Sequence, residues 1–284
     1  MPPSTIDPRD GLVNDVLHDL SAPALVTAIE ANLFDLFHRL GRWPRAEWHE
    51  DPELWWAITD IPSAMFNCAL RPRFTPDGLE AALEAVIARY QSGNVPAQWW
   101  TGPTTTPPDL GARLVAHGFR QTDDGPGMAV DLRALNEDTP LPPGFTIEKV
   151  NDAAALRTWF RPFVAGFEVG EDSTEPFIDW YEWAIFRARL PLQAYLGRLN
   201  GEPVACSSVY YGAGVAGIYD VATVPETRRQ GIGALITLAP LRDARALGYR
   251  AAILHASQMG RGVYTRLGFR QYCTIGQYMW SPGP

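Results

Sequence analysis

Two stretches in different halves of the chain share nearly the same letters, and this repeat limits the possible folds more than any other feature. RLVAHGFRQ spans residues 113–121 and VYTRLGFRQ spans residues 263–271. In both halves the patterns predict strands, a helix, a strand, a short helix, a Gly-Phe pair and a closing strand. Repeated order of this kind predicts two copies of one α/β fold in tandem, and 284 residues are enough for two domains.

A break in the pattern separates the two copies. The stretch NEDTPLPPG, residues 136–144, contains three prolines and has no hydrophobic periodicity, as expected of a linker. We therefore predict an N-terminal domain over residues 1–135, a linker over 136–144 and a C-terminal domain over 145–284.

Periodicity and turn residues predict the individual elements. Helices are expected at 22–40, 75–90, 108–117, 152–167, 176–189, 231–247 and 262–267. Strands are expected at 54–58, 65–70, 97–102, 127–132, 145–150, 192–199, 204–211, 215–224, 251–256 and 270–280. The helix at 75–90 would begin at Thr75-Pro76-Asp77-Gly78, with Thr75 as its N-cap.

Charge and cysteine content exclude several classes of function. The net charge of −8 argues against nucleic-acid binding, which needs a basic surface. No window approaches the ~18 apolar residues of a membrane span, and the polar N-terminus lacks the apolar region of a signal peptide. The three scattered cysteines form neither a metal-binding spacing nor a disulfide framework. We expect a cytoplasmic protein with no metal and no membrane or nucleic-acid partner.

The pair Gly231 and Gly233 lies between a predicted strand and a predicted helix, in TVPETRRQGIGALITL. Most isolated Gly-x-Gly pairs are only turns. Here, however, the first turn of the helix leaves N–H groups without partners and favours anions, and glycine lets a phosphate approach the backbone. A dinucleotide-binding loop would need a third glycine at Ile236, and no Gly-Lys-Ser/Thr follows. A phosphate-binding loop of another kind is therefore indicated.

The spacing Arg228-x-x-Gly231-x-Gly233 resembles the signature of the GNAT acyltransferases, whose loop binds the pyrophosphate of coenzyme A. VATVPETRRQGIGALIT, residues 221–237, is similar to the strand–loop–helix unit of that family. AAILHASQMGRGVYTRLGF, residues 251–269, is similar to the strand and short helix that follow it. The resemblance implies domains with a mostly antiparallel mixed sheet flanked by helices, and acetyl-CoA as the acyl donor.

The resemblance also implies which residues hold acetyl-CoA. The pyrophosphate would be held by Arg228 and Arg229 and by the N–H groups of Gln230, Gly231, Ile232, Gly233 and Ala234. The pantetheine arm would pair like an added strand with the backbone of Ala222, Thr223 and Val224. Ser257 lies where many members carry an Asn that touches the pantetheine, and its shorter side chain offers one hydroxyl.

Tyr264 matches the general acid that protonates the CoA sulfur in this family; the alternative is a tyrosine that only packs the helix onto the sheet. Asp220 is the first candidate for the general base, although a hydrogen-bonded carboxylate at a strand end is an equal alternative. Strand alternation predicts that it faces away from Tyr219 and Val221. His255 is the second candidate, and deprotonation through water would make either base dispensable.

The resemblance implies that the acceptor amine binds near the helical region 163–187, where carboxylates alternate with aromatic side chains. Glu168, Trp180 and Trp183 are the predicted substrate contacts, because an acidic, aromatic pocket attracts an ammonium group. The alternative is that the carboxylates form a solvated face and that the aromatic side chains form the contact between the domains. Trp99 and Trp100 are expected in the first domain's core or in that contact.

The N-terminal half departs from the family pattern and resembles a degenerate GNAT domain. Its stretch RPRFTPDGLEAAL, residues 71–83, has no Gly-x-Gly. Pro76 lacks an N–H group and Asp77 would repel a phosphate. Leu114 stands at the offset of Tyr264 from the Gly-Phe pair. We predict one working active site in an internal pseudo-dimer, which is a monomer or a homodimer.

The resemblance implies an N-acetyltransferase that transfers the acetyl group of acetyl-CoA to a primary amine of a small molecule or amino acid by direct attack. One alternative is a protein or peptide acceptor, which would need an open groove. The other is a non-catalytic acyl-CoA sensor, against which Tyr264 argues because a binding module needs no acid for the thiolate.

Overall fold

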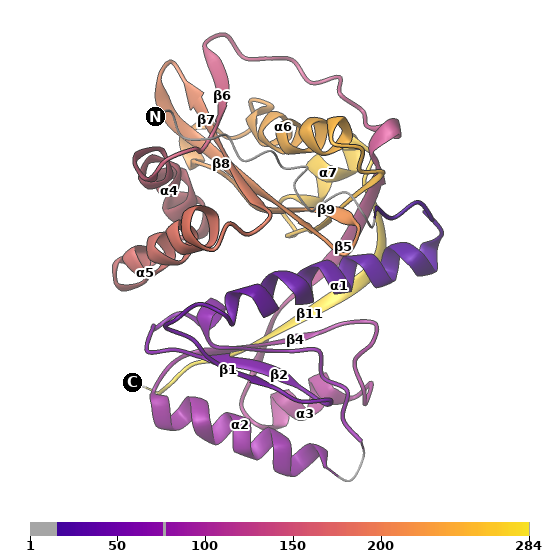
Figure 1. Ribbon diagram of the computed structural model, residues 1–284, viewed down its shortest axis with the longest axis vertical. Helices are drawn as coiled ribbons and strands as arrows, with labels where there is room; N and C mark the ends of the chain where they lie inside the picture. The colour runs from indigo at the N-terminus through magenta and orange to yellow at the C-terminus, as the bar shows by residue number, and fades with distance from the viewer. Residues whose placement is uncertain (1–15, 76–77, 284) are drawn as a thin grey trace.

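All strands join in one sheet. The computed structural model describes residues 16–75 and 78–283, and the sheet order is β1-β2-β3-β4-β11-β5-β10-β9-β8-β7-β6 (Figure 1). The N-terminal half contributes β1 (Glu47–Glu50), β2 (Trp55–Ile58), β3 (Cys68–Leu70), β4 (Ala97–Thr101) and β5 (Arg120–Asp131). The C-terminal half contributes β6 (Phe145–Lys149), β7 (Leu192–Leu199), β8 (Glu202–Gly212), β9 (Val215–Thr223), β10 (Ala251–His255) and β11 (Arg270–Trp280).

The sheet order shows that the two halves exchange their closing strands. Strand β11 lies between β4 and β5, and β5 lies beside β10. Among the described strands, only the pairs β3·β4 and β9·β10 are parallel, so the sheet is mixed and mostly antiparallel, as expected. The order around β5 and β11 has an internal symmetry in which β1 to β5 correspond to β7 to β11. The sequence did not predict that both halves would share one sheet, because local patterns do not specify which strand pairs with which.

Helices cover both faces of the sheet. One face carries α1 (Ala22–Leu40), α4 (Ala153–Phe167) and α5 (Glu171–Glu182), which pack into one core cluster together with Trp100 and Ile253. The neighbouring residues Trp99 and Leu254 face the opposite side. There they pack with α2 (Leu79–Gly93) and α3 (Leu110–Ala116) in the N-terminal half, and with α6 (Ile232–Ala246) and α7 (Arg261–Leu267) in the C-terminal half.

Helix α1 belongs to the N-terminal half but binds strands of the C-terminal half. The fully buried Asn32 donates to the Gly212 carbonyl at 2.8 Å and accepts from the Tyr219 hydroxyl at 2.7 Å. The Tyr210 hydroxyl donates to Asp35 at 2.6 Å. Because buried polar groups without partners are costly, these pairs fix where α1 crosses β8 and β9.

Most predicted elements are confirmed with small shifts at their ends. Strand β1 was not predicted, and the predicted strand at 65–70 is a 3-10 turn (Ala64–Phe66) followed by β3. Helix α5 begins earlier than predicted, at Glu171, and continues into a π-helical segment, Trp183–Arg187. The predicted helix start at Pro76 and Asp77 lies outside the described residues. Among the described helices, none is long and apolar enough to cross a membrane.

Candidate active site

The site begins where two parallel strands separate. Strands β9 and β10 pair through three positions, the last of which joins Ile218 to Leu254. Beyond this point, β9 continues to Thr223 and pairs only with β8 among the described residues. The other edge of β9 is therefore open, and an extended ligand can add to it as a strand would.

The open edge leads to the predicted phosphate-binding loop. Gly231 precedes α6 with φ of +81°, a conformation that glycine adopts without strain. The Ala234 N–H donates to the Gly231 carbonyl at 3.0 Å. Within the described chain, the N–H groups of residues 230–233 have no protein acceptor. A helix start with free N–H groups and the exposed Arg229 beside it can bind an anion.

The residues expected to contact the pantetheine differ in what they still offer. The Val224 N–H already donates to the Val204 carbonyl at 2.9 Å, within the sheet. The Thr223 carbonyl accepts from Arg228 Nε at 3.1 Å rather than from another strand. Ala222 is buried and pairs with β8. Ser257 lines the cavity described below, and its hydroxyl accepts the Gly260 N–H at 3.1 Å.

A β-bulge in β9 places Asp220 in the site. Tyr219 pairs with Ser208 and Ala222 with Cys206, so Asp220 and Val221 together oppose only Ser207. Asp220 has φ of +57°. The bulge breaks the alternation of the strand, and Tyr219 and Asp220 point to the same face, toward α1 and α5. The prediction that Asp220 faces away from Tyr219 is therefore wrong, because alternation holds only for a regular strand.

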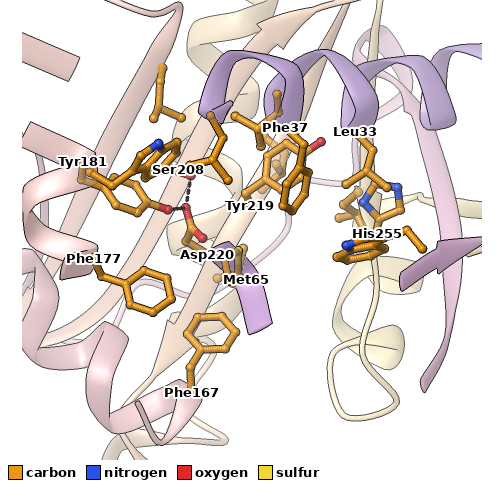
Figure 2. A pocket seen from close by; sticks show the side chains of 18 of the residues that line it. Leu33, Phe37, Met65, Phe167, Phe177, Tyr181, Ser208, Tyr219, Asp220 and His255 are labelled. Atoms are coloured by element: carbon orange, nitrogen blue, oxygen red, sulfur yellow. Dashed lines mark hydrogen bonds between the residues drawn. The ribbon is translucent and has the colours of Figure 1, made fainter. Parts of the chain in front are cut away.

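The Asp220 carboxylate is bound on one oxygen and open on the other. The Tyr181 hydroxyl donates to Oδ2 at 2.5 Å, and the Ser208 hydroxyl donates to the same oxygen (Figure 2). In the described part of the chain, Oδ1 has no hydrogen-bond donor. Burial raises the pKa of the Asp220 carboxyl above its ordinary value, while the two hydroxyl donors lower it. This carboxylate is thus a stronger base than an exposed aspartate.

Tyr264 lies on α7 and lines the same cavity as Asp220. It is 8 % exposed, and burial raises its pKa to about 12. Its hydroxyl is protonated at neutral pH and has no hydrogen-bond partner among the residues described. Such a group can supply a proton to a departing thiolate.

His255 follows the last position at which β10 pairs with β9, still pairs with Gly127 of β5, and also lines the cavity. Burial lowers its pKa to about 4, opposed by a hydrogen bond with the Ile29 backbone. The ring is therefore neutral at pH 7, and its Nε2 is buried without a partner in the described chain.

The cavity has a volume of about 230 Å³ and takes its walls from both halves of the molecule. Trp180 and Trp100 line it, whereas Trp99 is fully buried in the core. Glu168 is exposed and Trp183 is half-buried, and neither lines the cavity. The residues of the wall are mainly apolar: Leu33, Leu36, Phe37, Leu40, Met65, Phe66, Trp100, Phe167, Phe177, Trp180, Tyr181 and Leu192.

The carboxylates of the acidic, aromatic region lie away from the cavity. Glu175 pairs with Arg157 at 3.1 Å and Asp179 with Arg45 at 3.6 Å, and both carboxylates are more than half exposed. The aromatic side chains Phe177, Trp180 and Tyr181 are buried. These contacts therefore agree with the alternative interpretation of this region, in which the carboxylates form a solvated face and the aromatic side chains lie between the halves. Sequence reasoning did not identify Ser208, which carries no signal of its own within a buried strand.

The comparisons with known proteins agree with this geometry. Residues 153–269 match the Acetyltransferase (GNAT) family. The match lies within the C-terminal half. Acyl transfer is the activity of that family, and the match covers β9, the Gly231 loop, Tyr264 and most of the cavity's C-terminal wall. No curated protein matches the sequence.

Solved structures show that the fold of the whole chain is shared with GNAT proteins. A GCN5-related N-acetyltransferase from Kribbella flavida is 20% identical, with a TM-score of 0.68 over 94% of this chain and 98% of that one. A GCN5-related N-acetyltransferase from Sphaerobacter thermophilus is 16% identical, with a TM-score of 0.61 over 93% of both chains. A tandem GNAT protein from the clavulanic acid biosynthesis pathway is 15% identical, with a TM-score of 0.57 over 93% of this chain and 95% of that one. The chain therefore has the tandem GNAT architecture.

Proposed function

We propose that the protein transfers the acetyl group of acetyl-CoA to the primary amine of a small molecule, with Asp220 and Tyr264 as the reacting acid–base pair. One observation carries this proposal: a carboxylate with a free oxygen and a protonated phenol line a single cavity, next to the open edge of β9. The loop with free N–H groups at residues 230–233 lies at the end of that edge and would hold the pyrophosphate.

In the proposed reaction, the acceptor ammonium loses a proton to water and becomes a neutral amine. Its nitrogen attacks the thioester carbon, a C–N bond forms and the C–S bond breaks. Asp220 accepts the second proton from the nitrogen, and Tyr264 protonates the departing sulfur. The products are the N-acetyl amide, CoA with a free thiol and the proton released to water. Transfer of the second proton from Asp220 to the Tyr264 phenolate through water restores both residues. The buried hydroxyls of Tyr181 and Ser208 hold Asp220 in position throughout.

The shape of the site supports a small acceptor over a protein. Side chains of helices α1 and α5, both labelled in Figure 1, line the cavity. Its volume of about 230 Å³ is at the small end of ligand pockets, which are on the order of 300–1,000 Å³. A peptide chain would need an open groove instead.

The test is release of CoA from acetyl-CoA, followed with a thiol-reactive dye in the presence of a panel of amines and short peptides. Mass spectrometry of the product should show one added acetyl group on nitrogen. Release only with peptides would contradict the small-molecule proposal. Binding of acetyl-CoA without release for any acceptor would favour the sensor alternative.

A further inference from the structure

The chemistry of the cavity walls limits the class of amine that the proposed site can accept. We propose that the acceptor is an apolar primary amine without a carboxylate or phosphate, and that the N-terminal half selects it. This rests on the proposed function and adds the substrate class to it.

The first observation is the source of the walls. Leu33, Leu36, Phe37 and Leu40 come from α1, Met65 and Phe66 from the turn before β3, and Trp100 from β4. These residues face Phe177, Trp180 and Tyr181 of α5 across the cavity, and Figure 2 shows Phe37 on one side and Phe177 on the other. The half that lacks the cofactor loop thus supplies much of the surface that a substrate side chain would contact. Burial of an apolar group against these walls is favourable.

The second observation is the charge of the lining. Among the described residues that line the cavity, Asp220 is the one acidic residue, and none is Lys or Arg. His255 is neutral at pH 7, because burial lowers its pKa to about 4. An ammonium group would pair with Asp220 Oδ1. A carboxylate on the same substrate would be buried without a cation, which is strongly unfavourable.

The third observation concerns neutral polar groups. The indole N–H groups of Trp100 and Trp180 are buried without an acceptor in the described chain, and both residues line the cavity. They can donate to a neutral oxygen, such as a hydroxyl or ether. Two isolated indole donors do not compensate a full negative charge. Anionic acceptors are therefore still expected to bind poorly.

The mouth of the cavity offers a place to change this selection. Met65 and Phe167 line the cavity and are also 38% and 51% exposed. An arginine at Met65 can keep its alkyl stem on the apolar wall and its charge near water. Met65→Arg should therefore fold and add the missing cation from the N-terminal half.

The test compares 2-phenylethylamine with phenylalanine, which have the same ring and amine and differ by one carboxylate. Glucosamine serves as a polar amine without a carboxylate. Calorimetry measures binding of each to the protein with CoA present, and dye-detected CoA release gives kcat/KM. We expect 2-phenylethylamine to be preferred over phenylalanine by about 100-fold, and over glucosamine as well. Met65→Arg should reduce the preference over phenylalanine by about tenfold. Val115→Arg, which adds the same charge on α3 at an exposed residue outside the cavity, should not change it.

The outcomes separate this inference from the proposed function. Equal or better binding and turnover of phenylalanine or glucosamine would overturn the inference, while CoA release with them would still support acetyl transfer. If 2-phenylethylamine binds selectively but no amine causes CoA release, the inference stands and the proposed reaction fails. If none of the three amines binds, the inference is overturned.

Discussion

The two halves of the molecule have the same order of elements, but among the described residues only the C-terminal half has the open strand edge at which we propose that acetyl-CoA binds. In the C-terminal half, β9 and β10 separate after Ile218 and Leu254. In the N-terminal half, the chain beyond β3 and β4 stays joined, by a bridge between Arg73 and Thr106 and by a bond from the Phe74 N–H to the Thr106 carbonyl at 3.0 Å. The gap that would admit a pantetheine arm is thus closed in the first half.

Side chains at corresponding positions of the two halves also differ, and in each pair the C-terminal residue lines the cavity. Tyr264 of α7 lines the active-site cavity, whereas Leu114 of α3 is fully buried in the hydrophobic core. Both strands carry a residue with positive φ near the end of the parallel pair, Asp220 at +57° and Arg71 at +53°. In the C-terminal half this residue is a half-buried carboxylate; in the N-terminal half it is a guanidinium 4.7 Å from the Trp55 ring. On our proposal, one copy of the duplicated fold has no cofactor site and instead forms a wall of the cavity of the other copy.

The largest effect is expected from Gly233→Glu. A Cβ atom at Gly233 would have only Thr223 Oγ1 within 4 Å, at 3.7 Å, so the variant should fold. Its carboxylate would occupy the expected phosphate site and repel the pyrophosphate, lowering acetyl-CoA affinity by about 100-fold or more. Calorimetry measures the affinity, and Gly233→Ala is the control that should bind almost normally. Unchanged affinity of the glutamate variant would show that the pyrophosphate does not bind at this loop. Gly231 is less suitable, because any side chain there is strained at φ of +81°.

Tyr264→Phe should separate catalysis from binding. The phenol is the proposed acid for the thiolate, so kcat should fall by about 100-fold. The affinity for acetyl-CoA should stay within about twofold, because the proposed contacts of Tyr264 include no phosphate. Steady-state kinetics and calorimetry on the same preparation measure both. Unchanged turnover would show that Tyr264 only packs α7 onto the sheet.

The pH dependence tests Asp220. Its pKa is raised by burial, and it must be ionised to accept a proton, so kcat/KM should fall as the pH decreases through that raised pKa. Ser208→Ala removes a hydrogen bond that lowers this pKa, and the acidic limb should move to higher pH. Asp220→Asn should lower kcat/KM by about 10- to 100-fold and abolish the limb. The profiles are corrected for titration of the amine itself. A limb that Ser208→Ala leaves in place would remove Asp220 from the role of base.

The smallest effect on activity is expected from Leu114→Tyr. This change gives the N-terminal half a tyrosine at the position that corresponds to Tyr264. The strands there remain joined, so the new phenol should create no second site and should not rescue Tyr264→Phe. Because Leu114 is fully buried, the added hydroxyl should lower the free energy of unfolding by about 1–3 kcal/mol. Denaturant titration and CoA release measure the two effects. Restored turnover in the double variant would contradict the assignment of the first half as inactive.

Sequence patterns were sufficient for the parts of the molecule that depend on local structure. The Gly231 loop, α6 and the tandem order follow from periodicity and from residues close in the chain. The bulge at Asp220 was not predictable, because it depends on pairing with Ser208 and Cys206 from another strand. The exchange of β5 and β11 depends on long-range pairing in the same way. The part of the cavity wall that α1 forms could not be predicted either, since the apolar stripe of this helix is equally typical of an ordinary core helix.

We propose that one half of this duplicated chain binds acetyl-CoA, and the stoichiometry of binding tests this proposal most directly. A calorimetric titration of the wild-type protein should reach saturation at one acetyl-CoA per chain, and Gly233→Glu should remove that binding. Saturation at two per chain, or one site that survives Gly233→Glu, would contradict the account.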